Sequence, residues 1–591
     1  MSVDYTWDLS IFYQGFDDPA IEKDLNSIKE LIAKGNELLL AGEDQLSTLE
    51  KIVDVYESIA TLSENLSCFA NLTLAADASN EQAAQLMDRL MQLSVEVELL
   101  NSAYIRYLDS VNDLNALISS SEKLRKVDFS LLRSKEKAAH LIPKDIEPWM
   151  LRMSLTGAEA FSQLRDRLDA TLMVDYKCQQ LPLSAVRAKA YDPDADVRKS
   201  AYEAEIDAYK KIEIPMAACL NSIKGEAQTR CEIMKYDSVL SMTLAQSNMD
   251  QETLDAMLKA IDEALPKFRA YLRKKGELLG HKDGIPFYDL FAPVAAKGYK
   301  PRKYTVEQAR AKLLTEMGKF SPDMAVFIDN AFENRWIDMF PRAGKGGGAF
   351  CSTAHAHRQS RVLTNFAGSF SDVSTLAHEL GHAWHDRQMV DLPFMMIDTP
   401  MPLAETASIF NETLLAHSAR SQANDLEAFT LLEGELMENT QTIVDIYSRF
   451  LFESAVIDGR KDHALSVTEL KNAMLDAQDK TYGDGLAKDV RHPYMWACKC
   501  HYYFAGLDFY NFPYAFGMLF GKGMFALYKQ KGAAFVPEYN KLLSLCGSAK
   551  VADVAARVGI DVHSVDFWRA SLKVVTDDAD EFIRLADHIQ R

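Results

Sequence analysis

The 591-residue chain is long enough for one large core or for about two or three domains, and its 48% hydrophobic and 25% charged residues are ordinary for a soluble globular protein. Its formal net charge of −20 argues against nucleic acid or an anionic membrane as a partner, because both would be repelled at long range. We therefore expect an acidic globular protein with no nucleic-acid and no membrane partner.

The N-terminal stretch and the cysteines predict a cytoplasmic protein. Residues 1–18 are acidic and lack the basic start and apolar run of a signal peptide. The longest apolar run, Phe516 to Tyr528, is interrupted by Lys522 and three glycines, so we expect nothing to span a membrane. The eight cysteines are scattered without a C-x-x-C pair, which favours free thiols in a reducing compartment.

Helical patterning dominates the first part of the chain. Residues 1–112 contain almost no proline, and apolar residues after Ser79 recur at alternating steps of four and three. Such a stripe is typical of a seam between packed helices. We predict an N-terminal helical domain over residues 1–112.

Residues 113–195 are predicted to form a second segment, helical with a small β-hairpin. Thr171–Tyr176 and Leu183–Ala190 flank a short polar stretch and are typical of two paired strands. The following turn contains Pro193 between two aspartates, which predicts a boundary near residue 195.

The third predicted domain covers residues 196–591 and returns to helical patterning. Apolar residues at helical spacing precede Pro266, and we expect this proline to begin a second helix that ends at Gly280. Residues 344–348 include four glycines and predict either a flexible linker or a loop that approaches a substrate backbone. Arg361–Phe366 is typical of a strand, and its edge could pair with an extended peptide.

The stretch Asp372–Gln388 predicts a helix that carries an H-E-x-x-H array, with Ser371 or Asp372 as its N-cap. His378 and His382 lie one turn apart on the same face, so both imidazoles can bind one metal ion. Glu379 is placed to reach a water in the open position of that metal. The alternative is a surface helix with two unrelated histidines.

A catalytic zinc needs a third protein ligand, and the sequence offers two candidates. His385 shares the face of His378 but lies about 10 Å further along the helix axis, so we expect it to have a supporting role. Glu405 follows His378 by enough chain for a loop and a returning helix that opens at Pro402. We therefore predict a His-His-Glu site for Zn²⁺, although such ligands do not exclude cobalt or manganese.

Several stretches resemble one known family. HELGHAWH, PLAETASIFNE and HYYFAGLDFYNFPYAFG are similar to the zinc oligopeptidases of the thimet oligopeptidase and oligoendopeptidase F family, and GKGGGAFCS and RVLTNFAG resemble oligoendopeptidase F in particular. The resemblance implies a mainly α fold, with a large two-lobed helical shell around a deep substrate channel and a small β-sheet beside the H-E-x-x-H helix. It makes residues 196–591 the catalytic zinc peptidase domain.

The resemblance also implies a role for each site residue. The zinc ligands would be His378, His382 and Glu405, with Glu379 as the general base. The residues that would stabilise the oxyanion are His501, Tyr510 and Tyr514. Aromatic core packing is the alternative for each tyrosine of this region. Ser408 and Glu412 are either partners that orient the metal-binding imidazoles or ordinary polar residues of a helix.

These residues predict a zinc-dependent endopeptidase that hydrolyses internal peptide bonds of short oligopeptides. A metallocarboxypeptidase or a peptidyl-dipeptidase on the same fold is the alternative enzyme, and it would need a cation that binds a free C-terminal carboxylate. A helical binding protein without activity is disfavoured because no ligand position lacks a suitable residue. The sequence leaves the oligomeric state open.

Overall fold

The computed structural model describes residues 5–41, 44–294 and 298–589, and the chain is mainly helical in these ranges, which confirms the predicted fold class. None of the helices in these ranges combines the length and the hydropathy that a bilayer crossing requires. The first four residues of the acidic N-terminal stretch lie outside the described residues.

The chain forms two compact units, each made from separate stretches of sequence. The first contains Met1–Leu141, Lys300–Ser418 and Leu527–Gly559, and the second contains Ile142–Tyr299, Ala419–Ala526 and Ile560–Arg591. The domain boundaries that the sequence predicts at residues 112 and 195 stay a prediction.

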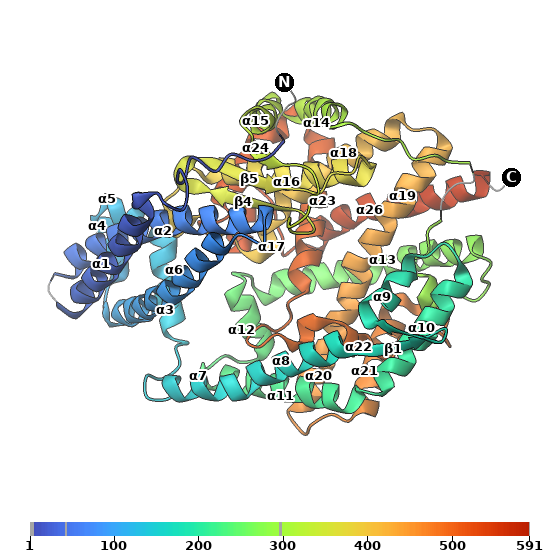
Figure 1. The fold of residues 1–591 in the computed structure, drawn as a ribbon, viewed down its shortest axis with the longest axis horizontal. Helices are drawn as coiled ribbons and strands as arrows, with labels where there is room; N and C mark the ends of the chain where they lie inside the picture. The colour runs from blue at the N-terminus through green and yellow to red at the C-terminus, as the bar shows by residue number, and fades with distance from the viewer. Residues whose placement is uncertain (1–4, 42–43, 295–297, 590–591) are drawn as a thin grey trace. The chain divides into compact units, whose positions relative to one another are not determined.

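The first unit joins the N-terminal helices to a small sheet, as the blue helices beside β4 and β5 show (Figure 1). Leucines of the predicted helical seam, such as Leu86, Leu93 and Leu100, are buried in a core that also includes Ala354 and Leu363 of the sheet. The N-terminal helices of this unit are α1 (Pro19–Ala41), α2 (Gln45–Ala76), α3 (Glu81–Ser110), α4 (Leu114–Ser120), α5 (Glu122–Arg125) and α6 (Asp128–Ala138).

The sheet of the first unit has the strand order β3-β5-β4. Its strands are β3 (Ile337–Asp338), β4 (Phe350–Ala354) and β5 (Gln359–Leu363). β5 pairs in parallel with β3 and antiparallel with β4. Both β4 and β5 pack against the helix α16 (Phe370–Met389), which confirms the small sheet predicted beside the H-E-x-x-H helix.

The predicted strand at residues 361–366 starts earlier than expected and lies in the middle of the sheet. Because β5 has a partner on both sides, it has no free edge for a peptide, and that prediction was wrong. β4 is the edge strand beside α16. The sequence pattern of a buried strand does not tell an edge from a centre, since both positions favour apolar residues.

The first unit has further helices, several of which pack against α16. They are α14 (Val306–Phe320), α15 (Pro322–Glu333), α17 (Met401–Ala404), most of α18 (Thr406–Gln422), α24 (Phe535–Leu545) and α25 (Val551–Ala556).

The second unit is built from helices and one hairpin. Its elements are α7 (Glu147–Thr156), α8 (Ala158–Thr171), β1 (Met173–Tyr176), β2 (Gln179–Pro182), α9 (Leu183–Arg187), η1 (Ala188–Tyr191), α10 (Ala195–Lys210), α11 (Glu213–Ile233), α12 (Val239–Gln246), α13 (Gln251–Leu278), η2 (Phe287–Asp289), α19 (Asp425–Thr440), the π-helical turn η5 (Gln441–Asp445), α20 (Ile446–Arg460), α21 (Val467–Tyr482), α22 (Met495–Cys498), η7 (Cys500–Tyr503), most of α23 (Phe512–Lys531) and α26 (Val565–Ile589).

The predicted hairpin exists, but its second strand is not Leu183–Ala190. Lys177 and Cys178 have φ values of 46° and 64°, so these two residues alone close the turn and Tyr176 pairs with Gln179. Two residues with positive φ form the turn type whose twist suits a hairpin. β2 therefore ends at Pro182, and Leu183–Arg187 forms a helix that buries Leu183 and Val186.

Pro266 does not begin a helix, because α13 runs through it from Gln251 to Leu278. The buried face of α13 continues past the proline with Phe268, Tyr271 and Leu272. This face packs along α26, where the rings of Tyr271 and Phe582 lie 5.2 Å apart. A proline in a helix interior costs about 3 kcal/mol, and packing along the whole helix outweighs that cost here.

Replacing this proline tests the account. Pro266 is exposed, and Pro266→Ala restores the missing N–H donor of the helix, so we expect the melting temperature of the chain to rise. Pro322→Ala is the matched control, because Pro322 lies in the first turn of α15, where no intrahelical donor is needed. Scanning calorimetry of both variants measures the difference. Equal melting temperatures for the two would contradict this explanation.

Candidate metal centre

The helix α16 begins at Phe370, two or three residues before the predicted start. Ser369 is its N-cap: the Ser369 hydroxyl accepts the backbone N–H of Asp372 at 3.1 Å, and the Asp372 carboxylate accepts the backbone N–H of Ser369 at 2.8 Å. Asp372 is therefore the third residue of a capping box and not the cap itself. This reciprocal pair fixes the first turn of the helix that carries the H-E-x-x-H array.

His378 and His382 point the same ring nitrogen at one place. Their Nε2 atoms are 3.2 Å apart, and each side chain is 24% exposed. The Nδ1–H of His378 donates to the Glu412 carboxylate at 3.1 Å. This bond leaves the lone pair of His378 Nε2 free to bind a metal ion.

Glu405 lies in the junction between α17 and α18, and not inside a helix that opens at Pro402 as expected. Its Oε2 atom is 3.4 Å from His378 Nε2 and 3.4 Å from His382 Nε2. The Ser408 hydroxyl donates to the same oxygen at 2.7 Å, which holds the carboxylate in this orientation.

The spacing of these three atoms fits a small tetrahedral cation. Ligand atoms at zinc distances of about 2.0–2.1 Å, arranged as a tetrahedron, are about 3.3 Å from one another. The separations of His378 Nε2, His382 Nε2 and Glu405 Oε2 are 3.2, 3.4 and 3.4 Å. Among the described residues, these three form the one group of histidine, cysteine and carboxylate side chains whose ligand atoms can hold an ion together.

The pKa values of this group reflect the mutual contact of its charges. Burial alone would lower the pKa of His378, but the hydrogen bond with Glu412 and the nearby carboxylates outweigh burial and raise that pKa to about 9. Burial alone would raise the pKa of Glu405, but the contacts with His382 and His378 lower it to about 2. Both shifts show that carboxylates and imidazoles lie in close mutual contact here, and such a carboxylate-rich site favours positive charge.

Glu379 lines a cavity together with His378, His382 and Glu405. This cavity has a volume of about 380 Å³ and is also lined by residues of β4. The side chain is buried, and this burial raises the pKa of Glu379 even though His378 and His382 oppose the shift. A carboxylate with a raised pKa accepts a proton more readily near neutral pH. Glu379 thus lines the cavity beside the two histidines, and its role as a general base stays a prediction.

His385 and Asp386 support the cavity from the far end of α16. His385 is buried, and this burial lowers its pKa to about 4, so the ring is neutral. The Thr353 and Ser360 hydroxyls donate to Asp386 Oδ2 at 2.7 and 3.2 Å, which ties β4 and β5 to the helix. Sequence reasoning missed Asp386, although its position four residues after His382 places it on the same helix face.

The remaining predicted site residues lie in the second unit. His501 stacks on Tyr510, with ring centroids 5.2 Å apart and an angle of 13° between the planes. The Tyr514 hydroxyl donates to the Tyr510 hydroxyl at 3.0 Å. Burial, together with Arg449 and other cations, lowers the pKa of His501 to about 4, so this ring is neutral at physiological pH. The structure thus brings His501, Tyr510 and Tyr514 together.

Two neighbouring tyrosines are core residues. Tyr502 and Tyr503 are 0% and 1% exposed, and the ring of Tyr502 packs on Phe452 at 4.9 Å. Tyr502 and Tyr503 therefore have the role of core packing, which was the alternative to oxyanion stabilisation for the tyrosines of this region. Tyr510 and Tyr514 are less buried, and their hydroxyls are hydrogen-bonded to each other.

Curated relatives and solved structures are similar to the chain over nearly its whole length. An oligoendopeptidase F homolog of Lactococcus lactis subsp. lactis is 24% identical over 98% of this chain and 97% of its own, and oligopeptidase PepF of Bacillus subtilis is 22% identical over 98% and 87%. The structure of oligoendopeptidase-F from Enterococcus faecium has a TM-score of 0.71 at 16% identity and covers 96% of this chain and 99% of that one.

A family model describes the part of the chain that contains every predicted site residue. The model of Peptidase family M3 matches residues 188–574, which is more than half of the sequence. This match and the full-length similarity to the oligoendopeptidase F relatives confirm the resemblance that the motifs indicated. The protein therefore belongs to peptidase family M3.

Proposed function

We propose that the protein is a zinc-dependent endopeptidase that hydrolyses internal peptide bonds of short oligopeptides. The observation that supports zinc most directly is the triangle of His378 Nε2, His382 Nε2 and Glu405 Oε2, whose sides suit tetrahedral zinc. Membership of family M3 supports a peptidase. The names oligoendopeptidase F and oligopeptidase PepF of its relatives support oligopeptides as substrates and an endopeptidase as the enzyme class.

The residues of the first unit divide the work as follows. His378, His382 and Glu405 hold the metal, and Glu412 orients His378 through its Nδ1–H. Bound zinc would supply a more acidic water and a polarised scissile carbonyl. Glu379 accepts a proton from the attacking water as the new C–O bond forms, and it then gives this proton to the nitrogen of the leaving amine as the C–N bond breaks.

The proposed oxyanion donors are the three residues of the second unit. A neutral His501 carries one N–H that can donate to a negatively charged oxygen, and the hydroxyls of Tyr510 and Tyr514 are linked to each other. Donors of this kind stabilise the charge that develops on the carbonyl oxygen during attack.

The edge of β4 is the proposed main-chain binding site for the peptide. Residues of this strand line the cavity that also contains Glu379, and β5 pairs with only one of its edges. Pairing of an extended peptide with a strand edge depends on backbone hydrogen bonds, which makes few demands on the peptide sequence. We propose the cytoplasm as the place of this activity, because the scattered cysteines suit free thiols in a reducing compartment.

Glu379→Gln separates catalysis from metal binding. We expect the variant to retain bound zinc while kcat/KM falls by about 10²–10⁴, because the amide cannot accept the proton of the water. Glu37→Gln, at an exposed position of α1, is the matched control and should be unchanged. Metal analysis and cleavage of a fluorogenic peptide measure the two properties. Unchanged turnover in Glu379→Gln would disprove the assigned role.

Glu412→Ala is expected to weaken metal binding, which Glu379→Gln should leave intact. Without the hydrogen bond to His378 Nδ1, we expect zinc affinity to fall by about 10–100-fold. Competition with a chromophoric chelator measures the affinity, and excess zinc should restore most of the activity. Cobalt and manganese titrations in the same assay test the alternative metals. If Glu412→Ala binds zinc as tightly as the parent chain, Glu412 does not orient the ligand.

Peptides blocked at both ends distinguish an endopeptidase from the alternative enzymes. We expect N-acetylated and C-amidated oligopeptides to be cleaved at internal bonds, with loss of cleavage after chelation of the metal. A carboxypeptidase or peptidyl-dipeptidase requires a free C-terminal carboxylate and releases one or two residues from that end. Mass spectrometry of the products identifies the bonds. Cleavage restricted to unblocked C-termini would replace the endopeptidase proposal with that alternative.

A further inference from the structure

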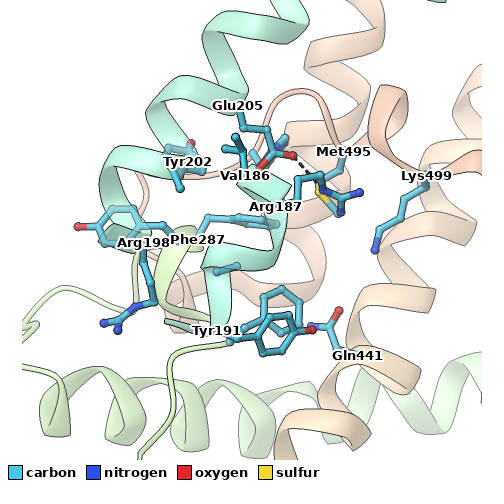
Figure 2. A pocket seen from close by; sticks show the side chains of 15 residues that line it. Val186, Arg187, Tyr191, Arg198, Tyr202, Glu205, Phe287, Gln441, Met495 and Lys499 are labelled. Carbon is cyan, nitrogen blue, oxygen red and sulfur yellow. Dashed lines mark ion pairs between the residues drawn. The ribbon is translucent and has the colours of Figure 1, made fainter. Parts of the chain in front are cut away.

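The second unit contains a pocket that none of the predicted site residues lines (Figure 2). Its walls come from α9, η1, α10 and η2, together with Gln441 of the π-helical turn, Met495 and Lys499. The pocket volume is about 250 Å³. A cavity of about 150 Å³ is enough to bind benzene, so this pocket can hold one substituted ring.

Aromatic side chains form a large part of the pocket wall. The ring of Tyr202 lies 5.8 Å from that of Tyr288 and 6.3 Å from that of Phe287, and Tyr191 lies 5.1 Å from Phe291. Tyr191 is 56% exposed, so its ring is available at the rim. Clustered ring faces and edges favour a planar aromatic ligand through stacked or edge-to-face contacts.

The charged lining residues are three cations, Arg187, Arg198 and Lys499, and one carboxylate, Glu205. Arg198 already has a buried carboxylate partner, because its Nε donates to Asp289 at 2.7 Å and its Nη1 donates to the Asp192 carbonyl at 2.6 Å. The other two cations are the ones that can serve a ligand.

Arg187 and Lys499 are incompletely paired. Arg187 Nε lies 3.1 Å from Glu205 Oε1, which is the ion pair drawn in Figure 2, and the Arg187 side chain is 38% exposed. Lys499 Nζ has its ion pair with Asp445 at 3.8 Å, which is longer than a hydrogen bond. In a chain with a net charge of −20, a pocket lining with more cations than carboxylates is a local exception that favours an anion.

We propose that this pocket binds a small aromatic carboxylate, a molecule with one planar ring and one carboxylate group. The ring would lie against Tyr202 and Phe287, and the carboxylate would pair with Arg187 and Lys499. A carboxylate matches the guanidinium and ammonium donors, and charge-assisted hydrogen bonds of this kind are stronger than neutral ones. Glu205 disfavours a ligand with a second negative charge on the same side.

Titration calorimetry of the zinc-loaded full chain tests the proposal with 3-phenylpropionate and its neutral amide, 3-phenylpropionamide, as probes. We expect saturable binding of the carboxylate and about tenfold weaker binding of the amide, which lacks the charge. The same loss is expected for the carboxylate in Lys499→Met. Lys499→Arg should restore most of the affinity.

Lys488→Met is the matched control, because Lys488 is exposed, is near in sequence and does not line the pocket. The metal centre is unchanged in all these variants, so any binding of the carboxylate to zinc cancels in the comparison. Tyr191→Ala provides a second test at an exposed ring, and it should weaken binding of the carboxylate and of the amide alike.

Three outcomes would overturn the proposal. They are no saturable binding up to about 10 mM 3-phenylpropionate, equal affinity for the carboxylate and the amide, and equal affinity in Lys499→Met and Lys488→Met. Melting curves of each variant show that the compared chains are folded. Should Lys499→Met not fold, the amide comparison and Tyr191→Ala decide the matter.

Discussion

The metal centre depends on the close approach of α16 and α18 at Gly381. A Cβ atom on Gly381 would lie 2.7 Å from the Ala407 carbonyl oxygen and 2.7 Å from the Cα of Ser408, a distance that real side chains do not tolerate. Because Glu405 comes directly before α18, this contact of helix on helix is what brings its carboxylate to the two imidazoles. Because Gly381 has no side chain, α18 can approach α16 between the two histidines, and this approach determines where Glu405 lies.

Sequence reasoning predicted the part of the site that depends on local geometry. The spacing of His378 and His382 is a property of any α-helix, and so is the position of Glu379 beside them. His385 is set aside as a ligand because seven residues of helix separate it from His378, and the rise per residue places the two too far apart to share one ion. Glu405 is chosen in its place. The grouping of His378, His382 and Glu405 in the structure agrees with this reasoning.

The errors arose where contacts distant in sequence decide local structure. Pro266 remains inside α13 because packing along α26 outweighs a local preference. The strand β5 is central because β3, which has only two residues and no readable pattern, pairs with it. The charged pocket of the second unit could not be predicted for the same reason, since Arg187 and Lys499 are brought together only by the fold.

A buried ion network orients the group of His501, Tyr510 and Tyr514 in the second unit. Lys224, which is 0% exposed, contacts Glu453 at 2.6 Å and Asp508 at 2.8 Å, and Glu453 also accepts the N–H of Phe509 at 3.1 Å. Phe509 has a φ of 51°, a conformation that costs a bulky residue about 1–2 kcal/mol. A buried ion network tolerates few rearrangements, because any lost partner leaves an uncompensated charge. The strained turn before Tyr510 is therefore held in one conformation by a lysine 284 residues before Asp508.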